Sequence, residues 1–482
     1  MTFTESSHQH QLDQMLDQIT ESFTISDQQL TTLVSSLHSE LTRSLQRNHR
    51  HTSELHMLPS FIHTQPPSGL SLGMSIDASG KRVRITSVNF SHNSPPSPPT
   101  TQVFVTPRCM LSSPPSGVFD FVAYCIQEFI QSNNLEGQEV LPLGITIGLP
   151  LSNTGGAGFS VSETAKEDSL DLTGSNVARR LYDTVLRNHL PVRITSVTNN
   201  TVSALIAARH MDKTTRVAAA FNHGVNAAYF EQLHNIEQQP QITRNHAQPA
   251  KTADSRRGTP EIVAINTEIV AINTEIGRFG SLHNSSALPL TMWDRCVDRE
   301  SRTPGARTFE KLVADKYLGE ITRNILLDLM DCRLLFSTTT DATRISTEYT
   351  FHTAYMAPIM EDCSTDLCSV EDIFAAEFNI SGISLRDRRT IQRICCLVAR
   401  RAAKLAGAVL AALVLKAGLK AEEPVSVALS GVLFDVNFEI YEMAVDTLKC
   451  ILMQLQGDGV VGVLLQSRGS DLFGAAVNAA SF

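Results

Sequence analysis

Hydrophobic residues near the beginning of the chain recur every three or four positions over residues 1–56. They are Leu12, Met15, Ile19, Phe23, Leu30, Leu33, Leu37 and Leu41. This spacing places them on one face of a helix, with polar residues on the other faces. The pattern predicts an N-terminal helical segment over residues 1–56.

Beyond that segment, strand patterns and helical patterns alternate along the chain. The strand patterns cover residues 72–88 (a pair), 143–149, 192–197, 217–230 (two strands around a turn) and 425–434. The helical patterns cover residues 119–130, 177–186, 309–329, 389–415 and 438–455. Alternation of this kind predicts an α/β architecture. We expect a surface loop at 94–99 and a polar insertion at 238–257.

Length and composition narrow the class of protein. The chain has 482 residues, several times the ~100–150 of one domain, which favours two lobes. Its net charge of −9 disfavours a nucleic-acid binder, because such proteins carry a basic surface. The nine cysteines are scattered and form no CxxC pair, so reduced thiols inside a cell are expected rather than disulfides or a metal site.

Two further observations concern membranes and targeting. The first residues are polar and show no apolar signal core, so we expect no signal peptide. The longest apolar run, residues 405–415, is shorter than the roughly 20 residues that span a bilayer. We therefore expect a buried helix there and no membrane interaction.

A heptapeptide is repeated in tandem. Glu-Ile-Val-Ala-Ile-Asn-Thr occurs at 261–267 and again at 268–274. The unit is too short for a solenoid repeat. It is either a local duplication or an error in the gene model, and it either lengthens a loop or displaces a strand.

Several short motifs occur in an order and spacing that resemble the single-copy hexokinases of fungi. They are Met-Leu-Pro-Ser-Phe at 57–61, Leu-Pro-Leu-Gly at 141–144, Asn-Thr-Glu-Ile-Gly-Arg-Phe-Gly at 273–280, Leu-Pro-Leu-Thr at 288–291, Pro-Gly at 304–305, Phe-Glu-Lys at 309–311, Tyr-Leu-Gly-Glu at 317–320 and Arg-Arg-Ala-Ala at 400–403. The resemblance runs from about residue 10 to the end of the chain. It implies a two-lobed α/β fold of the hexokinase and actin-like ATPase type, with a cleft between the lobes. We expect the small lobe at 57–222, with part of the large lobe at its start, and the large lobe at 223–482.

On the sugar side of the cleft, the resemblance implies five binding residues. They are Thr164, Asn199, Asn226, Glu275 and Glu310. Carboxylates and amides suit a hexose because they accept and donate hydrogen bonds at fixed geometry. Two positions depart from the family: Ala165 replaces a lysine, with Lys166 one step on, and Gly148 replaces a serine. Two interpretations stay open, a retained glucose site and an old cleft whose polar residues satisfy one another.

On the phosphate side, the resemblance leaves only remnants of nucleotide binding. They are Asp77, Gly80, Gly224 and Gly431. The family's first phosphate loop, Asp-Leu-Gly-Gly-Thr-Asn, reads Asp-Ala-Ser-Gly-Lys-Arg at 77–82. The second, Gly-Thr-Gly-Ser-Asn, reads Asn-His-Gly-Val-Asn at 222–226. The adenosine segment Val-Asp-Gly-Ser reads Leu-Ser-Gly-Val at 429–432, and the C-terminal glycine-rich motif becomes Ser-Asp-Leu-Phe-Gly-Ala-Ala at 470–476. Lys81 and Arg82 can still attract phosphate by charge, so the first loop alone does not exclude a nucleotide.

The catalytic base of the family is an aspartate in Asn-Asp-Thr, and this chain has Asn200 in its place. An amide has no useful basicity, so the ~10²–10⁴-fold contribution of a general base is lost. Positioning and metal electrostatics carry most of phosphoryl transfer, but the residues expected to supply them have changed as well. No catalytic residue is intact, and no resident cofactor or metal is expected.

The resemblance is to the atypical hexokinase-like regulators of filamentous fungi. It implies a non-catalytic regulator or sugar sensor in carbon-source and carbon-starvation signalling, including repression of secreted proteases. Such a protein would bind a hexose such as glucose and an unidentified regulatory protein, in the cytoplasm and the nucleus. Two alternatives stay open: a weak ATP:D-hexose 6-phosphotransferase that uses Mg-ATP, and a structural scaffold with an empty cleft.

Overall fold

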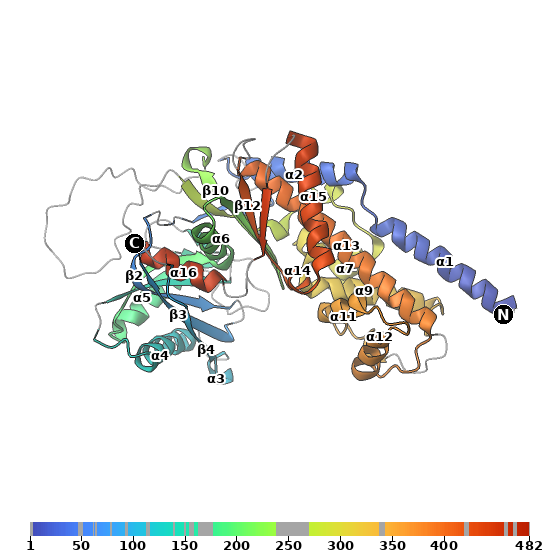
Figure 1. Ribbon diagram of the computed structural model, residues 1–482, viewed down its shortest axis with the longest axis horizontal. Helices are drawn as coiled ribbons and strands as arrows, with labels where there is room; N and C mark the ends of the chain where they lie inside the picture. The colour runs from blue at the N-terminus through green and yellow to red at the C-terminus, as the bar shows by residue number, and fades with distance from the viewer. Residues whose placement is uncertain are drawn as a thin grey trace.

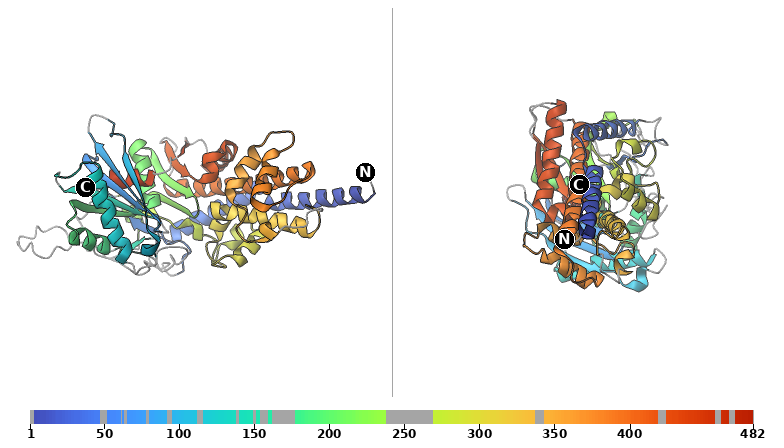
Figure 2. Two further views of the ribbon diagram at one scale, coloured as in Figure 1. Left: turned by 90° about the horizontal axis from the view of Figure 1, so that it is seen from below. Right: turned by 90° about the vertical axis from the view of Figure 1, so that its right-hand side faces the viewer.

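The computed structural model contains two large β-sheets set side by side, each covered by helices (Figure 1). The structure describes residues 3–46, 52–60, 62, 65–77, 80–91, 95–111, 116–137, 140–148, 151–153, 159–161, 177–237, 269–336, 343–418, 424–456, 461–465 and 470–481. The molecule is elongated, with the N-terminal helix at one end and the first sheet toward the other (Figure 2). This arrangement confirms the predicted two-lobed α/β fold.

The first sheet has five strands in the order β4-β3-β2-β5-β8. Their bounds are β2 Gly69–Ile76, β3 Arg82–Phe90, β4 Thr100–Val105, β5 Leu141–Ile147 and β8 Val192–Asn199. The first three strands pair antiparallel, whereas β5 pairs parallel with both β2 and β8. The helices α4 (Ser116–Ser132) and α5 (Val177–Arg187) share one hydrophobic core with this sheet. The C-terminal helix α16 (Ser470–Ala480) contacts β2, β3, β5 and β8.

The second sheet has six strands in the order β1-β11-β10-β9-β12-β13. Their bounds are β1 Leu58–Ser60, β9 Thr215–Phe221, β10 Val225–Gln232, β11 Ile269–Asn273, β12 Val425–Ser430 and β13 Val461–Leu465. The long helix α13 (Leu385–Lys416) contacts β9 and β12, and packs against α2 (Asp27–Arg43), α9 (Asp315–Asp331) and α15 (Phe438–Gln456). The helix α6 (Asn200–Met211) contacts β9 and β10 and also α16, so it connects the two sheets (Figure 1).

Shorter elements complete the described part of the chain. The remaining helices are α1 Phe3–Phe23, α3 Arg108–Leu111, α7 Met292–Glu300, α8 Thr308–Val313, α10 Thr343–Ser346, α11 Met356–Glu361, α12 Cys368–Ile373 and α14 Val432–Val436. A two-stranded hairpin is formed by β6 Leu151–Asn153 and β7 Phe159–Val161. Single turns are η3 Leu233–Asn235, η4 Ile276–Arg278, η5 Ser285–Ala287, η6 Thr353–Tyr355 and the π-turn η7 Phe374–Phe378.

Two predicted elements were wrong in extent. The helix expected over 309–329 is divided at Ala314, whose extended backbone separates α8 from α9. The amide of Asp315 then donates to the carbonyl of Asn222 (2.8 Å) and ties the break to the β9–β10 turn. The strand expected over 425–434 ends at Ser430, because Gly431 and the short helix α14 follow it. The other predicted helices and strand pairs are confirmed, and the loop at 94–99 is confirmed for its described residues 95–99.

The predicted N-terminal helical segment consists of α1 and α2, which are separated by a short break. Ser26 caps α2 by accepting from the amide of Gln29. A fully buried ion pair anchors the end of α1: Arg401 contacts Asp294 at 2.6 Å, and its guanidinium lies 4.3 Å from the centre of the Phe23 ring. The segment is therefore part of the large hydrophobic core.

Residues 405–415 lie inside α13 and are almost entirely buried, which confirms the expected buried helix. Across the described ranges, no helix has both the length and the apolar character needed to cross a bilayer.

The structure also locates the tandem repeat and the lobe boundaries in part. The second heptapeptide copy contributes β11, whereas residues 261–268 and the predicted insertion at 238–257 lie outside the described residues. The boundary at 222/223 stays a prediction. The strand β9 precedes this boundary but is hydrogen-bonded within the six-stranded sheet. The helix α16 follows the boundary but packs against the five-stranded sheet.

Candidate active site

Three of the predicted sugar-binding residues meet where β8 and β11 end and β10 begins. The Nδ2 of Asn226 donates to Asn199 Oδ1 (3.4 Å), to Asn273 Oδ1 (2.7 Å) and to Glu275 Oε1 (3.2 Å). The amide nitrogen of Glu275 donates back to Asn226 Oδ1 at 3.0 Å. The result is a compact set of amide and carboxylate groups from three strands.

Glu275 occupies an unusual backbone conformation in this set. Its φ of 55° and ψ of 44° lie in the left-handed region, which non-glycine residues seldom adopt and which is often associated with functional sites. Its side chain is buried and accepts from Asn273 Nδ2 (3.0 Å). Burial raises the pKa of Glu275, while the charge of Arg307 opposes that rise.

Glu310 joins the same site from α8. Its Oε2 accepts from the amide of Val225 (3.0 Å), which is the residue before Asn226. Gly224 and Gly277 allow this approach, since a Cβ at either position would lie about 3 Å from Glu310 Oε2. Arg307 Nη1 also donates to Glu310 Oε2 at 3.3 Å.

Asn200 is the first residue of α6, directly beside this set. Asn199 caps the helix by accepting from the amide of Thr201 (2.9 Å), as asparagine commonly does. The Oδ1 of Asn200 accepts from the same amide at 2.9 Å. The position of the family's base therefore carries a neutral amide that is hydrogen-bonded to its own helix.

The first phosphate-loop remnant is the turn between β2 and β3. The amide of Gly80 donates to the carbonyl of Asp77 (2.9 Å), and Gly80 has a φ of 66° that favours glycine. Arg82 Nε lies 3.6 Å from Asp77 Oδ2. The charged side chains of this turn thus contact each other.

The second phosphate-loop remnant is the turn between β9 and β10, which includes His223 and Gly224. His223 Nδ1 lies 3.2 Å from Asp315 Oδ2, although the imidazole itself is 91% exposed. The hydrogen bond to Asp315 raises the pKa of His223, against opposing effects of burial and of the nearby cations Lys316 and Arg82.

The remaining remnants lie at the ends of β12 and α16. A Cβ on Gly431 would lie 2.7 Å from the carbonyl oxygen of Phe221, so only glycine fits between β9 and α14. At the start of α16, Asp471 pairs with Arg84 of β3 (3.0 Å) and accepts from Ser75 of β2 (3.1 Å). This network fixes the segment that is glycine-rich in the family.

Comparison with known proteins identifies the family. A family model described as hexokinase matches residues 216–481, and a second hexokinase model matches residues 15–210. The chain belongs to the hexokinase family. Hexokinase-1 of Saccharomyces cerevisiae is 29% identical over 412 residues, which are 84% of this chain and 79% of the yeast protein. Hexokinase-2 of Candida albicans is 29% identical over 424 residues, which are 87% of this chain and 82% of that protein.

Solved hexokinases share the fold over nearly the whole chain. The hexokinase of Schistosoma mansoni complexed with glucose has a TM-score of 0.82 at 23% identity, covering 98% of this chain and 99% of that one. A second hexokinase crystal structure has a TM-score of 0.73 at 21% identity, again covering 98% and 99%. These matches support the two-lobed hexokinase and actin-like ATPase fold.

Sequence reasoning missed several residues of this hexokinase site. Asn273 is the first residue of the motif at 273–280 and lies two positions before Glu275. In the structure it is the last residue of β11. Arg307 and Asp315 lay in no motif singled out for binding. Asp471 lay in the changed motif at 470–476, but its partners Arg84 and Ser75 are distant in sequence. Thr164 and its neighbour Lys166 lie outside the described residues.

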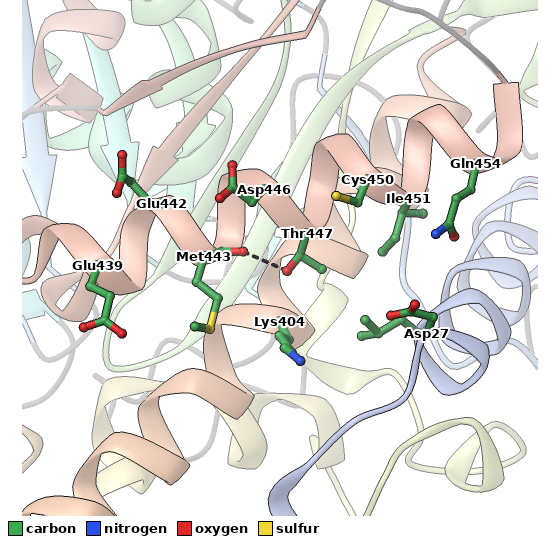
Figure 3. Close-up of a pocket in the computed structure, with 11 residues that line it drawn as sticks. Asp27, Lys404, Glu439, Glu442, Met443, Asp446, Thr447, Cys450, Ile451 and Gln454 are labelled. Atoms are coloured by element: carbon green, nitrogen blue, oxygen red, sulfur yellow. Dashed lines mark hydrogen bonds between the residues drawn. The ribbon is translucent and has the colours of Figure 1, made fainter.

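A different pocket of about 350 Å³ lies between α2, α13 and α15 (Figure 3). Its lining includes Glu439, Glu442 and Asp446 of α15 and Lys404 of α13. Its lining contains none of the predicted sugar or phosphate residues. In the part of the chain that the structure describes, no three His, Cys, Asp or Glu side chains are grouped as metal ligands.

Proposed function

We propose that this hexokinase family member binds a sugar without phosphorylating it and acts as a regulator or sugar sensor. The observation that carries the proposal is the contrast around the start of α6. Asn199, Asn226 and Glu275 hydrogen-bond as a ready-made polyol site, yet the adjacent base position is the amide of Asn200.

The phosphate side supports the same proposal. Asp315 is the first residue of α9, where its carboxylate interacts favourably with the helix N-terminus. The Asp315 carboxylate contacts His223, which belongs to the turn that the family uses for phosphate. A nucleotide phosphate at this turn would therefore meet a carboxylate of the same sign, which disfavours its binding there.

The cellular role that we propose follows from the resemblance to non-catalytic hexokinase-like proteins of filamentous fungi. It is signalling of carbon source and carbon starvation, including repression of secreted proteases. A regulatory protein would be the downstream partner. The retained lobes would then report sugar occupancy through their closure.

Two measurements on the full-length protein test the proposal. A coupled assay with glucose and Mg-ATP should show no sugar-dependent turnover above background. Sugar at millimolar concentration should raise the melting temperature, because a ligand that binds only the folded state stabilises it. Kinases typically have kcat values of ~1–100 s⁻¹. Turnover within about a hundredfold of that of an ordinary hexokinase contradicts the proposal.

The second candidate is a weak ATP:D-hexose 6-phosphotransferase. It is favoured by Lys81 and Arg82, which place two positive charges at the first phosphate turn, with Asp77 and Gly80 retained. Slow turnover that depends on both glucose and Mg²⁺, and that is lost on Arg82→Ala, would support it. The scaffold alternative requires that no sugar changes the melting temperature.

A further inference from the structure

Two arginines adjoin the carboxylates of the candidate sugar site. Arg307 Nη1 lies 3.4 Å and 3.3 Å from the two carboxylate oxygens of Glu310. Arg278 lies three residues after Glu275, and its amide donates to the carbonyl of Glu275 (3.1 Å). Each carboxylate therefore has an arginine on the same short segment of chain.

Backbone contacts bring these two segments together. The amide of Phe309 donates to the carbonyl of Phe279 (3.0 Å), and the amide of Thr308 donates to Ser281 Oγ (3.3 Å). Gly277 permits the close packing, because a Cβ there would lie 3.0 Å from Glu310 Oε2. Arg307 is thus placed next to the η4 turn that carries Arg278.

The electrostatic environment agrees with this placement. Burial, followed by the charges of Arg278 and Arg307, lowers the pKa of His56 to about 4. Burial and the charge of Arg307 also lower the pKa of Arg278. Arg278 Nε donates to the carbonyl of Glu54 (3.2 Å), and the charges of Glu275 and Glu54 partly offset the lowering of the Arg278 pKa.

Arg307 also restricts what Glu310 can bind. A neutral hexose that donates a hydroxyl to Glu310 has to share the carboxylate with a guanidinium that already contacts both oxygens. The backbone of Arg307 has a φ of 53°, so its position is set by the fold around it. A ligand that brings its own anion would engage the arginines and release Glu310 for a hydroxyl.

We infer that the site takes a sugar acid, a hexose derivative with a carboxylate, in preference to the neutral hexose. The hydroxyls would bind Glu275, Glu310 and the Asn226 amide, and the carboxylate would bind Arg307 and Arg278. A planar guanidinium forms paired hydrogen bonds with a carboxylate, which a hydroxyl cannot reproduce. This inference rests on the proposed function, since it names the ligand class of the same site.

Calorimetric titration of the full-length protein tests the inference with three probes at constant ionic strength: D-glucose, D-gluconate and D-glucuronate. Gluconate carries the carboxylate at C1 and glucuronate at C6, so the two arms show which end faces the arginines. We expect at least one sugar acid to bind tenfold or more tightly than glucose. Sodium acetate at the same concentration controls for a carboxylate without a sugar and should not bind measurably.

Substitution of Arg307 completes the test. Arg307→Gln should weaken the favoured sugar acid at least tenfold and tighten the binding of glucose, because Glu310 then no longer shares its carboxylate with a guanidinium. Arg295→Gln, on the exposed face of α7, should change neither affinity. Circular dichroism melting of each variant establishes that it is folded.

The outcomes separate this inference from the proposed function. Glucose binding as tight as, or tighter than, both acids overturns the inference and leaves sugar sensing intact. Absence of binding by all three probes overturns both. Glucose-dependent ATP turnover, measured separately, contradicts the proposed function without bearing on the preference for an acid.

Discussion

The sugar side and the phosphate side of the cleft lie next to each other but differ in how their polar groups are satisfied. On the sugar side, Asn199, Asn226 and Glu275 from three strand ends hydrogen-bond mutually and stay oriented as a binding set. On the phosphate side, charged groups pair off individually, as His223 does with Asp315. Strand ends within a sheet hold side-chain positions firmly, whereas turns tolerate replacement. We propose that the same scaffold has kept one half-site and lost the other.

The largest effect is expected from rebuilding the phosphate side. Asn200→Asp alone should leave ATP turnover at background, because phosphate must also be held in line. Adding Asn222→Gly, His223→Thr and Asp315→Gly to Asn200→Asp should raise turnover by about 10²-fold or more, since misplacement of about 1 Å costs roughly that factor. A coupled assay with glucose and Mg-ATP measures both proteins.

The variant that carries Asn222→Gly, His223→Thr and Asp315→Gly without Asn200→Asp is the control, and it should remain inactive. A further stage would restore the first turn with Ser79→Gly, Lys81→Thr and Arg82→Asn. If Asn200→Asp alone gave robust turnover, the nucleotide site would be intact. The two sides of the cleft would then differ only in the residue at position 200.

A smaller but clear effect is expected on the sugar side. Glu275→Gln or Glu310→Gln should weaken the best sugar ligand at least tenfold, or about 1.4 kcal/mol, because hydrogen bonds to charged acceptors are worth ~1.5–3 kcal/mol. Calorimetric titration gives the affinities. Glu442→Gln, on the exposed side of α15, removes a carboxylate outside the cleft and should have no effect.

Retained affinity in both glutamine variants would show that the hydrogen-bonded set is only structural. It would favour the scaffold interpretation over sugar sensing.

The sequence predicted the fold better than the contacts within the candidate site, for a physical reason. Periodic patterns such as the one in α13 report burial directly, and motif residues such as Glu275 keep their identity at strand ends. The break at Ala314 escaped prediction, because the residues on both sides of it are compatible with a continuous helix. The amide of Asp315 donates to Asn222, a contact across 93 positions that no local pattern reveals.

The pairs on the phosphate side escaped prediction for a related reason. Arg84 and Asp471 are nearly 400 residues apart, and each alone is an ordinary surface charge. Arg307 likewise became important only when Glu310 and the η4 turn were placed beside it. The substitutions in the motifs predicted a changed phosphate side, and the structure was needed to show which contacts the changed residues make.

A still smaller effect concerns the start of α16. Asp471→Asn should lower the free energy of unfolding by about 1 kcal/mol, because it removes a partly buried ion pair and weakens a shared contact with Ser75. Urea unfolding at neutral pH measures the change. Asp120→Asn is the matched control, since its pair with Arg187 is long (3.6 Å) and exposed, and it should change stability little. Equal effects of the two variants would mean that the Arg84–Asp471 pair stabilises the fold no more than an exposed surface ion pair does.

The smallest expected effect is a pH dependence from His223. The hydrogen bond to Asp315 raises the pKa of His223 above its ordinary value of 6.5. The folded protein then binds this proton more tightly than the unfolded chain, so the contribution to stability is fully present below pH 6.5. It is lost as the pH rises through the folded-state pKa.

His223→Gln should therefore destabilise the protein at pH 5.5–6 and have no effect near pH 9. The size should be ~0.2–1 kcal/mol, because the imidazole is 91% exposed and water screens the pair. Urea unfolding across this pH range gives the difference, and NMR titration of the His223 ring gives its pKa directly. Asp315→Asn should return that pKa toward 6.5. A destabilisation that is the same at pH 6 and pH 9 would show that His223 contributes through packing rather than charge, and the phosphate turn would then not be held by an ion pair.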